Sequence, residues 1–159
     1  MAKSLAKGAC ENGLTVVSGL AIGIDTAAGE ASVPYGCAVA VLGNGLDYVY
    51  PLENSDLQKK IGSAGLLLSE YPDGTPPTQR SFPARNRIIA GLSKGTVIVE
   101  AQKYSGTMIT AAFALEFNRE LAAVPQRAGE GSVCNEIIKE GGTLVETTDD
   151  LLFWLGLKK

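Results

Sequence analysis

Short apolar runs alternate along the chain with longer segments of helical periodicity. The runs are almost continuous in Val, Leu, Ile and Ala, as expected when helices cover both faces of a parallel sheet. This pattern predicts an α/β fold: a Rossmann-like, doubly wound, mostly parallel sheet with helices on both faces. The predicted strands span residues 15–18, 38–42, 66–70, 96–100, 121–124 and 143–145. The predicted helices span residues 2–12, 25–32, 53–63, 84–92, 107–118, 133–140 and 149–155.

The start of the chain departs from the usual order of such a sheet. The predicted helix 2–12 ends at Gly13, a good left-handed cap, but no strand precedes it. A Rossmann-like unit normally opens with a strand, so we expect its first strand to be missing. The length of 159 residues otherwise predicts a single domain over residues 1–159.

Composition narrows the possible functions. A net charge of −3 counts against a broad basic surface for nucleic acid, so any such binding needs a local site. Four basic residues do fall close together: Arg80, Arg85, Arg87 and Lys94. No apolar run approaches membrane-spanning length and no signal-peptide pattern opens the chain, so we expect a cytoplasmic protein that does not bind membranes.

The chain has three cysteines and no histidine. Cys10, Cys37 and Cys134 are far apart and form no CxxC motif, so we expect buried reduced thiols rather than a disulfide or a zinc site. The lack of histidine excludes Ser–His and Cys–His catalysis. No paired carboxylates point to acid–base work, and we expect no catalytic residues, metal or cofactor.

The segment SFPARNRIIAGLS, residues 81–93, is the most informative stretch. Pro83 suits the first position of a helix, which puts Arg85, Asn86 and Arg87 at an end with unpaired N–H groups that attracts phosphate. Phe82 then precedes the helix in an exposed loop. It either packs onto its own helix as a hydrophobic staple or offers a stacking platform to a nucleobase.

Two further segments have the composition of phosphate-binding turns. Ser18 and Gly19 end the first predicted strand, and Gly23 and Asp25 open the next helix, where backbone N–H groups could approach a ligand. A tight turn that merely requires glycine is the alternative. The start Ser105-Gly106-Thr107 of a later helix fits either ordinary N-capping or a phosphate or sugar contact.

The run Gly43-Asn44-Gly45 begins like a dinucleotide fingerprint, but Tyr48 stands where the third glycine belongs. This mismatch disfavours an NAD(P) site. The following Tyr50-Pro51 is interpreted as a rigid turn.

Taken in order, SGLAIGID, VLGNGLDYVYP, LLLSEYP, FPARNRIIAGLS, VIVEA and YSGTMITA resemble the DNA-processing protein A (DprA/Smf) family. The resemblance implies a cytoplasmic bacterial protein that binds single-stranded DNA, protects it and loads RecA recombinase during natural transformation. It also implies a homodimer without enzymatic activity, and a positively charged pocket at the carboxyl edge of the sheet. The family's first strand and any C-terminal winged helix are expected to be absent.

Carried over by position, the resemblance assigns DNA contacts to residues of the three segments described above. Three positions depart from the family pattern: Ile22 replaces a basic residue, Gly29 a common histidine and Asn118 a frequent glycine. The loss of a basic residue at position 22 predicts one phosphate contact fewer. The implied DNA-binding residues are Ser18, Gly19, Gly23, Asp25, Phe82, Arg85, Asn86, Arg87, Ser105, Gly106 and Thr107.

Two other functions stay open at this point. Related phosphoribohydrolases cleave nucleoside monophosphates with a PGGxGTxxE motif, whereas this chain has Gln102-Lys103-Tyr104 in place of the PGG element and Thr110 in place of the glutamate. These replacements disfavour hydrolysis but not small-nucleotide binding. A scaffold whose pocket has lost its ligand is the third possibility, because Ile22 and Gly29 depart from the family pattern.

Overall fold

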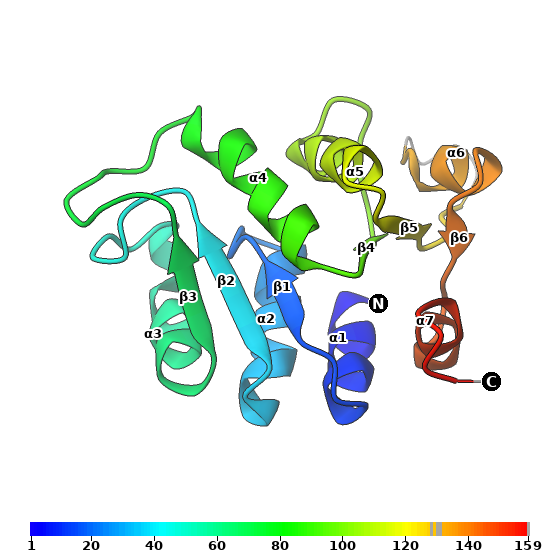
Figure 1. Cartoon of the computed structure of the whole chain (residues 1–159), viewed down its shortest axis with the longest axis horizontal. Helices are drawn as coiled ribbons and strands as arrows, with labels where there is room; N and C mark the ends of the chain where they lie inside the picture. The colour runs from blue at the N-terminus through cyan, green and yellow to red at the C-terminus, as the bar shows by residue number, and fades with distance from the viewer. Residues whose placement is uncertain (128, 130–131, 159) are drawn as a thin grey trace. The chain divides into compact units, whose positions relative to one another are not determined.

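The computed structural model describes residues 1–127, 129 and 132–158. The chain divides into two compact units, one covering Ala2–Arg85 and the other Met1 and Asn86–Lys159. Each unit contains its own three-stranded parallel sheet (Figure 1). None of the helices within the described residues is long and apolar enough to cross a membrane.

The first unit is built on β1 (Val16–Ser18), β2 (Ala38–Leu42) and β3 (Leu66–Ser69), in the order β1-β2-β3. Val16 is opposite Ala38, and Val39 is opposite Leu66. Its helices are α1 (Ala2–Glu11), α2 (Ile24–Ser32) and α3 (Ser55–Ala64), with 3₁₀ turns at Val33–Tyr35 and Leu52–Asn54. The buried core cluster consists of Leu20, Ala38, Ala40, Leu42, Leu57 and Ile61.

The second unit is built on β4 (Gly95–Ile98), β5 (Glu120–Ala123) and β6 (Thr143–Leu144), in the order β4-β5-β6. Its helices are α5 (Gly106–Glu116), α6 (Cys134–Lys139) and α7 (Thr148–Trp154). Helix α4 (Ser81–Leu92) begins in the first unit and ends in the second. The core cluster consists of Ile98, Ala101, Ala111, Ala123, Val133, Cys134 and Ile137.

The sequence prediction of an α/β, mostly parallel fold is confirmed, and each predicted strand and helix lies within a few residues of an observed one. The prediction of one domain over the whole chain stays a prediction, because each unit is described by itself. One helix boundary was wrong. Helix α4 begins at Ser81, so Pro83 is its third residue and not its first.

Thr78 explains why α4 begins early. The Ser81 amide donates to Thr78 Oγ1 at 3.1 Å, and the Thr78 amide donates to Ser81 Oγ at the same distance. This reciprocal pair satisfies N–H groups that a helix start leaves open. Because the signal is Thr-x-x-Ser and not Pro, the turn containing Phe82 joins the helix.

Helices α1, α5, α6 and α7 are each followed by a residue with positive φ, and two of these residues bear on the sequence predictions. Gly13 follows α1 with φ of 76°, as the sequence predicts, and Asn118 follows α5 with φ of 52°. The Arg119 amide then donates to the Ala114 carbonyl at 2.8 Å and closes the turn. Asparagine tolerates this conformation better than most residues, so the departure at position 118 preserves the cap.

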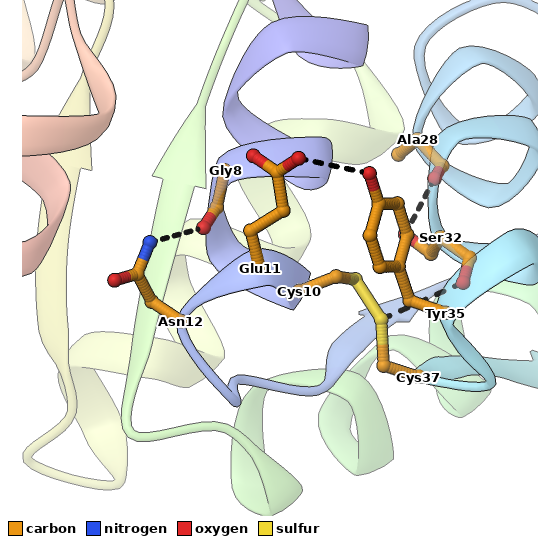
Figure 2. The surroundings of a disulfide bond; sticks show 8 residues. All are labelled: Gly8, Cys10, Glu11, Asn12, Ala28, Ser32, Tyr35 and Cys37. Atoms are coloured by element: carbon orange, nitrogen blue, oxygen red, sulfur yellow. Dashed lines mark hydrogen bonds between the residues drawn. A yellow bond between two sulfur atoms is a disulfide. The ribbon is translucent and has the colours of Figure 1, made fainter.

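The cysteine prediction was wrong for one pair. Cys10 at the end of α1 and Cys37 just before β2 form a disulfide, with their Cα atoms 6.1 Å apart (Figure 2). The Tyr35 hydroxyl donates to the Glu11 carboxylate at 2.9 Å next to it. A separation of 27 residues says nothing about this proximity, which arises from the packing of α1 beside the segment that leads into β2. Cys134 is free and buried, as predicted.

Candidate nucleic-acid interface

The loop between β1 and α2 is held by a carboxylate. Asp25 Oδ2 accepts hydrogen bonds from the Gly19 amide at 2.9 Å and the Ala21 amide at 3.2 Å. Asp25 therefore organises the loop, and the N-cap of α2 is Gly23. The Gly19 amide, expected to face phosphate, already has a partner.

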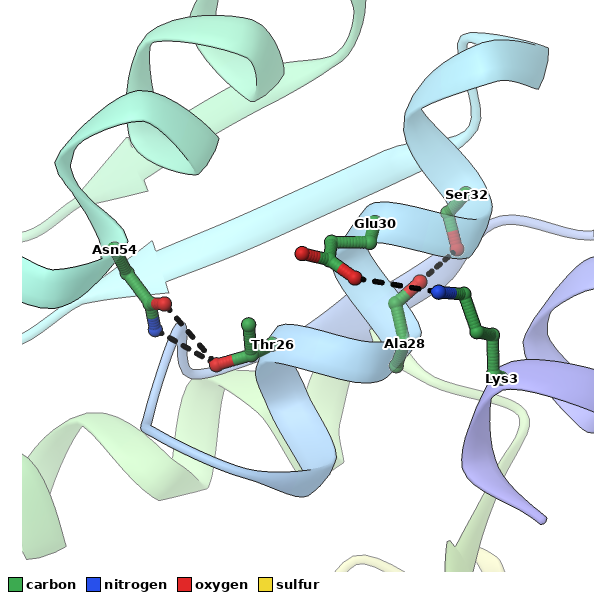
Figure 3. A network of polar contacts seen from close by, with 6 residues as sticks. All are labelled: Lys3, Thr26, Ala28, Glu30, Ser32 and Asn54. Atoms are coloured by element: carbon green, nitrogen blue, oxygen red, sulfur yellow. Dashed lines mark hydrogen bonds and ion pairs between the residues drawn. The ribbon is translucent and has the colours of Figure 1, made fainter.

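The same loop is tied to the segment that starts α3. The buried Asn54 donates from Nδ2 to the Leu20 carbonyl at 2.9 Å and is hydrogen-bonded to Thr26 Oγ1 at 2.9 Å. Figure 3 shows the Asn54–Thr26 contact, with Thr26 in the first turn of α2. Leu20 has φ of 60° and a fully buried side chain. The loop is thus fixed by contacts at Gly19, Leu20 and Ala21.

The tip of this loop faces solvent. Ile22 is 64% exposed. Gly23 has φ of 98°, and a Cβ atom there would meet nothing within 4 Å. By contrast, a Cβ at Gly29 would lie 3.2 Å from Leu57 Cδ2, so Gly29 belongs to the packed interior. Its departure from the family pattern is a matter of packing in this chain.

Arg85 is buried, with only 6% of its surface exposed. Its Nη1 donates to the Gly19 carbonyl at 2.8 Å and also to the Val41 carbonyl. Burial lowers the pKa of the guanidinium, and the charges of Asp25 and Tyr71 oppose that shift. The sequence placed Arg85 at an open helix end, but the structure shows it joining the carboxyl ends of β1 and β2. It shapes this edge of the sheet from within.

Phe82 lies in the first turn of α4 and is half-buried, which corrects the prediction of an exposed loop position. Its ring stacks on Tyr50, with centroids 5.1 Å apart and planes inclined by 26°. On the Gly43 side the approach is so close that a Cβ there would lie 2.8 Å from Phe82 Cδ1. The sequence places Tyr50 in a turn and carries no signal of its contact with Phe82.

In the second unit, polar residues gather at the start of α5. Asn86 Nδ2 donates to the Gly106 carbonyl at 3.2 Å and so connects α4 to this helix start. Ser105 is the N-cap residue, yet its side chain makes no capping bond. Its buried Oγ has no hydrogen-bond partner among the residues that the structure describes. Thr107 is half-buried and Arg87 is exposed.

The structure thus divides the predicted DNA contacts into two groups. The first unit brings Gly19, Asp25 and Arg85 together, and the second brings Asn86 to Gly106. Whether these residues contact DNA stays a prediction. In the described part of the chain, no cluster of three or more Cys, Asp or Glu could hold a metal ion. The first unit holds Ser18, Gly19, Gly23, Asp25, Phe82 and Arg85, and the second holds Asn86, Arg87, Ser105, Gly106 and Thr107.

The family model described as DNA recombination-mediator protein A matches residues 1–155. The chain belongs to this family. The match covers all of both sheets, and the resemblance inferred from the sequence motifs is confirmed.

Curated relatives agree with this membership. DNA processing protein DprA of Streptococcus pneumoniae is 47% identical over 145 residues, which are 89% of this chain and 51% of that protein. Protein Smf of Synechocystis sp. is 42% identical over 157 residues, which are 97% of this chain and 39% of that protein. The chain therefore spans about half or less of the length of these family members.

Solved structures of the family have the same fold. DNA processing protein A from Streptococcus pneumoniae matches with a TM-score of 0.86 and 45% identity, over 96% of this chain and 56% of that one. The protein from Helicobacter pylori matches with a TM-score of 0.90 and 32% identity, over 97% of this chain and 71% of that one. The Helicobacter pylori structure describes a single-stranded DNA binding mode of that protein.

Proposed function

We propose that this chain binds single-stranded DNA. The observation that carries the proposal is the match, over 97% of the chain, to a family member whose structure describes a single-stranded DNA binding mode. Single strands are gripped by cationic groups that follow the backbone and by aromatic rings on which bases stack. Such a local grip suits a chain with a net charge of −3, which lacks the charge for a broad basic surface.

Each unit supplies part of this chemistry. In the second unit, the exposed Arg87 provides positive charge, and the 11-residue helix α5 begins with Ser105, Gly106 and Thr107. A helix start has unpaired N–H groups and partial positive charge, which favour phosphate oxygens. In the first unit, Gly23 exposes the start of α2 and leaves room for a backbone to approach.

We further propose that the DNA bound by this chain is protected and passed to RecA recombinase during natural transformation, and that the chain acts in the cytoplasm as a homodimer without an enzymatic step. Family membership supports this role, since the matching family is one of recombination mediators. The chain lacks histidine, which excludes Ser–His and Cys–His nucleophiles. The proposal is therefore one of binding and transfer.

Titration of a fluorescent oligo-dT with the chain tests the central proposal. We expect saturable binding that weakens with salt, because phosphate contacts release counterions. Replacing Arg87 with Ala should lower affinity and reduce the slope of log K against log salt by about 0.7, the value for one phosphate contact on a single strand. Lys59→Ala, an equal charge loss on the exposed face of α3, is the matched control and should change little.

Three results would contradict this assignment. Absence of oligo-dT binding by the folded chain overturns DNA binding itself. Equal effects of Arg87→Ala and Lys59→Ala would mean that only net charge matters. Tight binding of a mononucleotide without oligo-dT binding would favour the small-nucleotide function instead.

Transfer to RecA requires its own measurement. RecA assembly on oligo-dT can be followed through its DNA-dependent ATPase, with and without this chain. We expect the lag before ATP hydrolysis to shorten when the chain is present. An unchanged or longer lag would contradict the transfer step while leaving DNA binding intact.

A further inference from the structure

Tyr50 has an unusual combination of exposure and fixed position. Its side chain is 45% exposed although one ring face stacks on Phe82. Because Phe82 covers one face of the ring, a further flat ring could stack only on the opposite face. An aromatic ring that is both exposed and stacked on a second ring is a ready-made platform for a further flat ring.

The loop that carries Tyr50 is held by buried amides. Asn44, which is 1% exposed, donates from Nδ2 to the Gly45 carbonyl at 2.9 Å and to the Tyr48 carbonyl at 3.2 Å. Gln58 on α3 is also buried and donates to the same Tyr48 carbonyl at 2.9 Å. These bonds fix the backbone two residues before Tyr50. The ring is thus presented by an ordered loop, which lowers the entropy lost on binding.

Contacts to the following loop restrain the same segment. The Gly45 amide donates to the Thr75 carbonyl at 2.9 Å, and the Asp47 carboxylate accepts the Gly74 amide at 3.0 Å. A Cβ at Gly45 would lie 2.7 Å from the Pro72 carbonyl oxygen, so only glycine allows this close approach. Gly45 of the dinucleotide-like run therefore allows the loop that carries Tyr50 to pack closely against the following loop.

Phe82 supports the Tyr50 ring from behind. The hydrogen bonds between Thr78 and Ser81 fix the turn that carries Phe82, and the Gly43 backbone lies close to its ring. Phe82 is half-buried and lies between the Gly43 backbone and the Tyr50 ring. It therefore has less exposed surface than Tyr50. The arrangement is a two-ring stack in which Tyr50 is the outer member.

We propose that the outer face of Tyr50 stacks on a nucleobase of the bound strand and that Phe82 is the positioning residue behind it. This rests on the proposed function and adds to it: the ligand is recognised through its bases as well as its phosphates. Stacking requires a flat base but no particular sequence, so every nucleobase can occupy the site. Loss of one such contact weakens binding roughly five- to a hundredfold.

An abasic oligonucleotide separates base contacts from phosphate contacts. We expect the wild-type chain to bind oligo-dT more tightly than an abasic strand of equal length. Tyr50→Ala should lower oligo-dT affinity roughly five- to a hundredfold and leave abasic binding unchanged, so the difference shrinks. Tyr50→Trp should keep it, and its added indole fluorescence should be quenched by oligo-dT. Tyr35→Ala, which removes a 44% exposed tyrosine bonded to Glu11, is the matched control and should keep wild-type affinity.

The outcomes distinguish this inference from the proposed function. If Tyr50→Ala binds both strands as the wild type does, the platform is wrong and DNA binding stands. If the wild-type chain binds neither strand, the proposed function fails first. Should Tyr50→Ala unfold in a circular dichroism melt, Tyr50→Leu retains apolar packing against Phe82 and removes only the aromatic face. Wild-type affinity in the folded Leu variant would equally overturn the inference.

Discussion

Arg85 Nη1 lies 2.8 Å from the Gly19 carbonyl oxygen and donates a hydrogen bond to it. The contact is so close that a Cβ atom at Gly19 would lie 2.6 Å from Arg85 Nη2. A side chain at position 19 would therefore collide with the Arg85 guanidinium in its observed position. Both residues belong to the motifs that resemble the family, and in this chain they are in direct contact.

Replacing Arg85 with Ala should destabilise the protein. The substitution removes the guanidinium that serves the buried carbonyls of Gly19 and Val41, and unpaired buried acceptors are costly. We expect a loss of roughly 2–4 kcal/mol in the free energy of unfolding. Urea unfolding followed by circular dichroism measures it. The exposed Arg87→Ala is the control and should change stability by less than about 0.5 kcal/mol. An Arg85→Ala chain with unchanged stability and lost DNA affinity would instead make Arg85 a direct phosphate ligand.

Replacing Ile22 with Arg should strengthen DNA binding. Ile22 is exposed at the tip of the β1–α2 loop. The resemblance to the family predicts a basic residue at this position. A new phosphate contact should raise oligo-dT affinity and steepen the slope of log K against log salt by about 0.7. Leu66→Arg adds the same charge at the exposed start of β3 and is the control. If both variants gain equally, the loop tip has no special place in binding.

Reducing the Cys10–Cys37 disulfide should lower stability. The bond closes a loop of 27 residues and so restricts the unfolded chain. On the chain-entropy account this contributes about 3.5 kcal/mol. We expect the wild type to unfold at lower urea concentration with dithiothreitol than without it. The Cys10→Ser, Cys37→Ser double variant lacks the bond and should unfold at the same urea concentration with and without dithiothreitol. An identical midpoint for the oxidised and reduced wild type would contradict the prediction.

Helix α7 should lose stability in acid. Asp150 Oδ2 accepts from Thr147 Oγ1 at 2.8 Å and from the Glu146 and Thr147 amides at 3.1 and 2.8 Å. These bonds, that of the Thr147 side chain first, lower the pKa of Asp150 below its ordinary value of 3.8. Since the folded pKa is the lower one, the stabilisation is present above pH 3.8 and is lost as the pH falls through the folded value.

Thermal melts from pH 7 downward test the acid dependence. Asp150→Asn should lower the melting temperature at neutral pH and flatten its fall below pH 3.8. Asp56→Asn removes an exposed carboxylate that pairs with Lys59 three residues away, and serves as the control. Parallel acid profiles for the wild type and Asp150→Asn would rule out a contribution of this cap.

The fold could be predicted from the sequence because the patterns that mark its strands and helices are local. Apolar runs mark the strands, and Gly13 marks the end of α1 through a conformation that few other residues adopt. The start of α4 was misplaced since Pro83 gave a stronger signal than the Thr78–Ser81 pair, which only the folded turn brings into reciprocal contact.

The candidate site was harder to predict from the sequence because its contacts join segments that are far apart along the chain. Arginine is rarely buried, so nothing near Arg85 indicates that strand-end carbonyls 44 and 66 residues away would enclose it. The Cys10–Cys37 pairing and the Tyr50–Phe82 stack depend in the same way on tertiary packing. A tyrosine beside a proline fits a turn equally well whether or not its ring meets another.

Asn54 lies four residues after Tyr50 and holds the β1–α2 loop through the Leu20 carbonyl and Thr26. The short stretch from Tyr50 to Asn54 therefore determines both the position of the Tyr50 ring and the conformation of the β1–α2 loop. Individual side chains here can change with local effects, but an inserted or deleted residue between positions 50 and 54 would displace both at once. Natural or designed variants of this chain should accordingly differ in the amino-acid sequence of this stretch but keep its length.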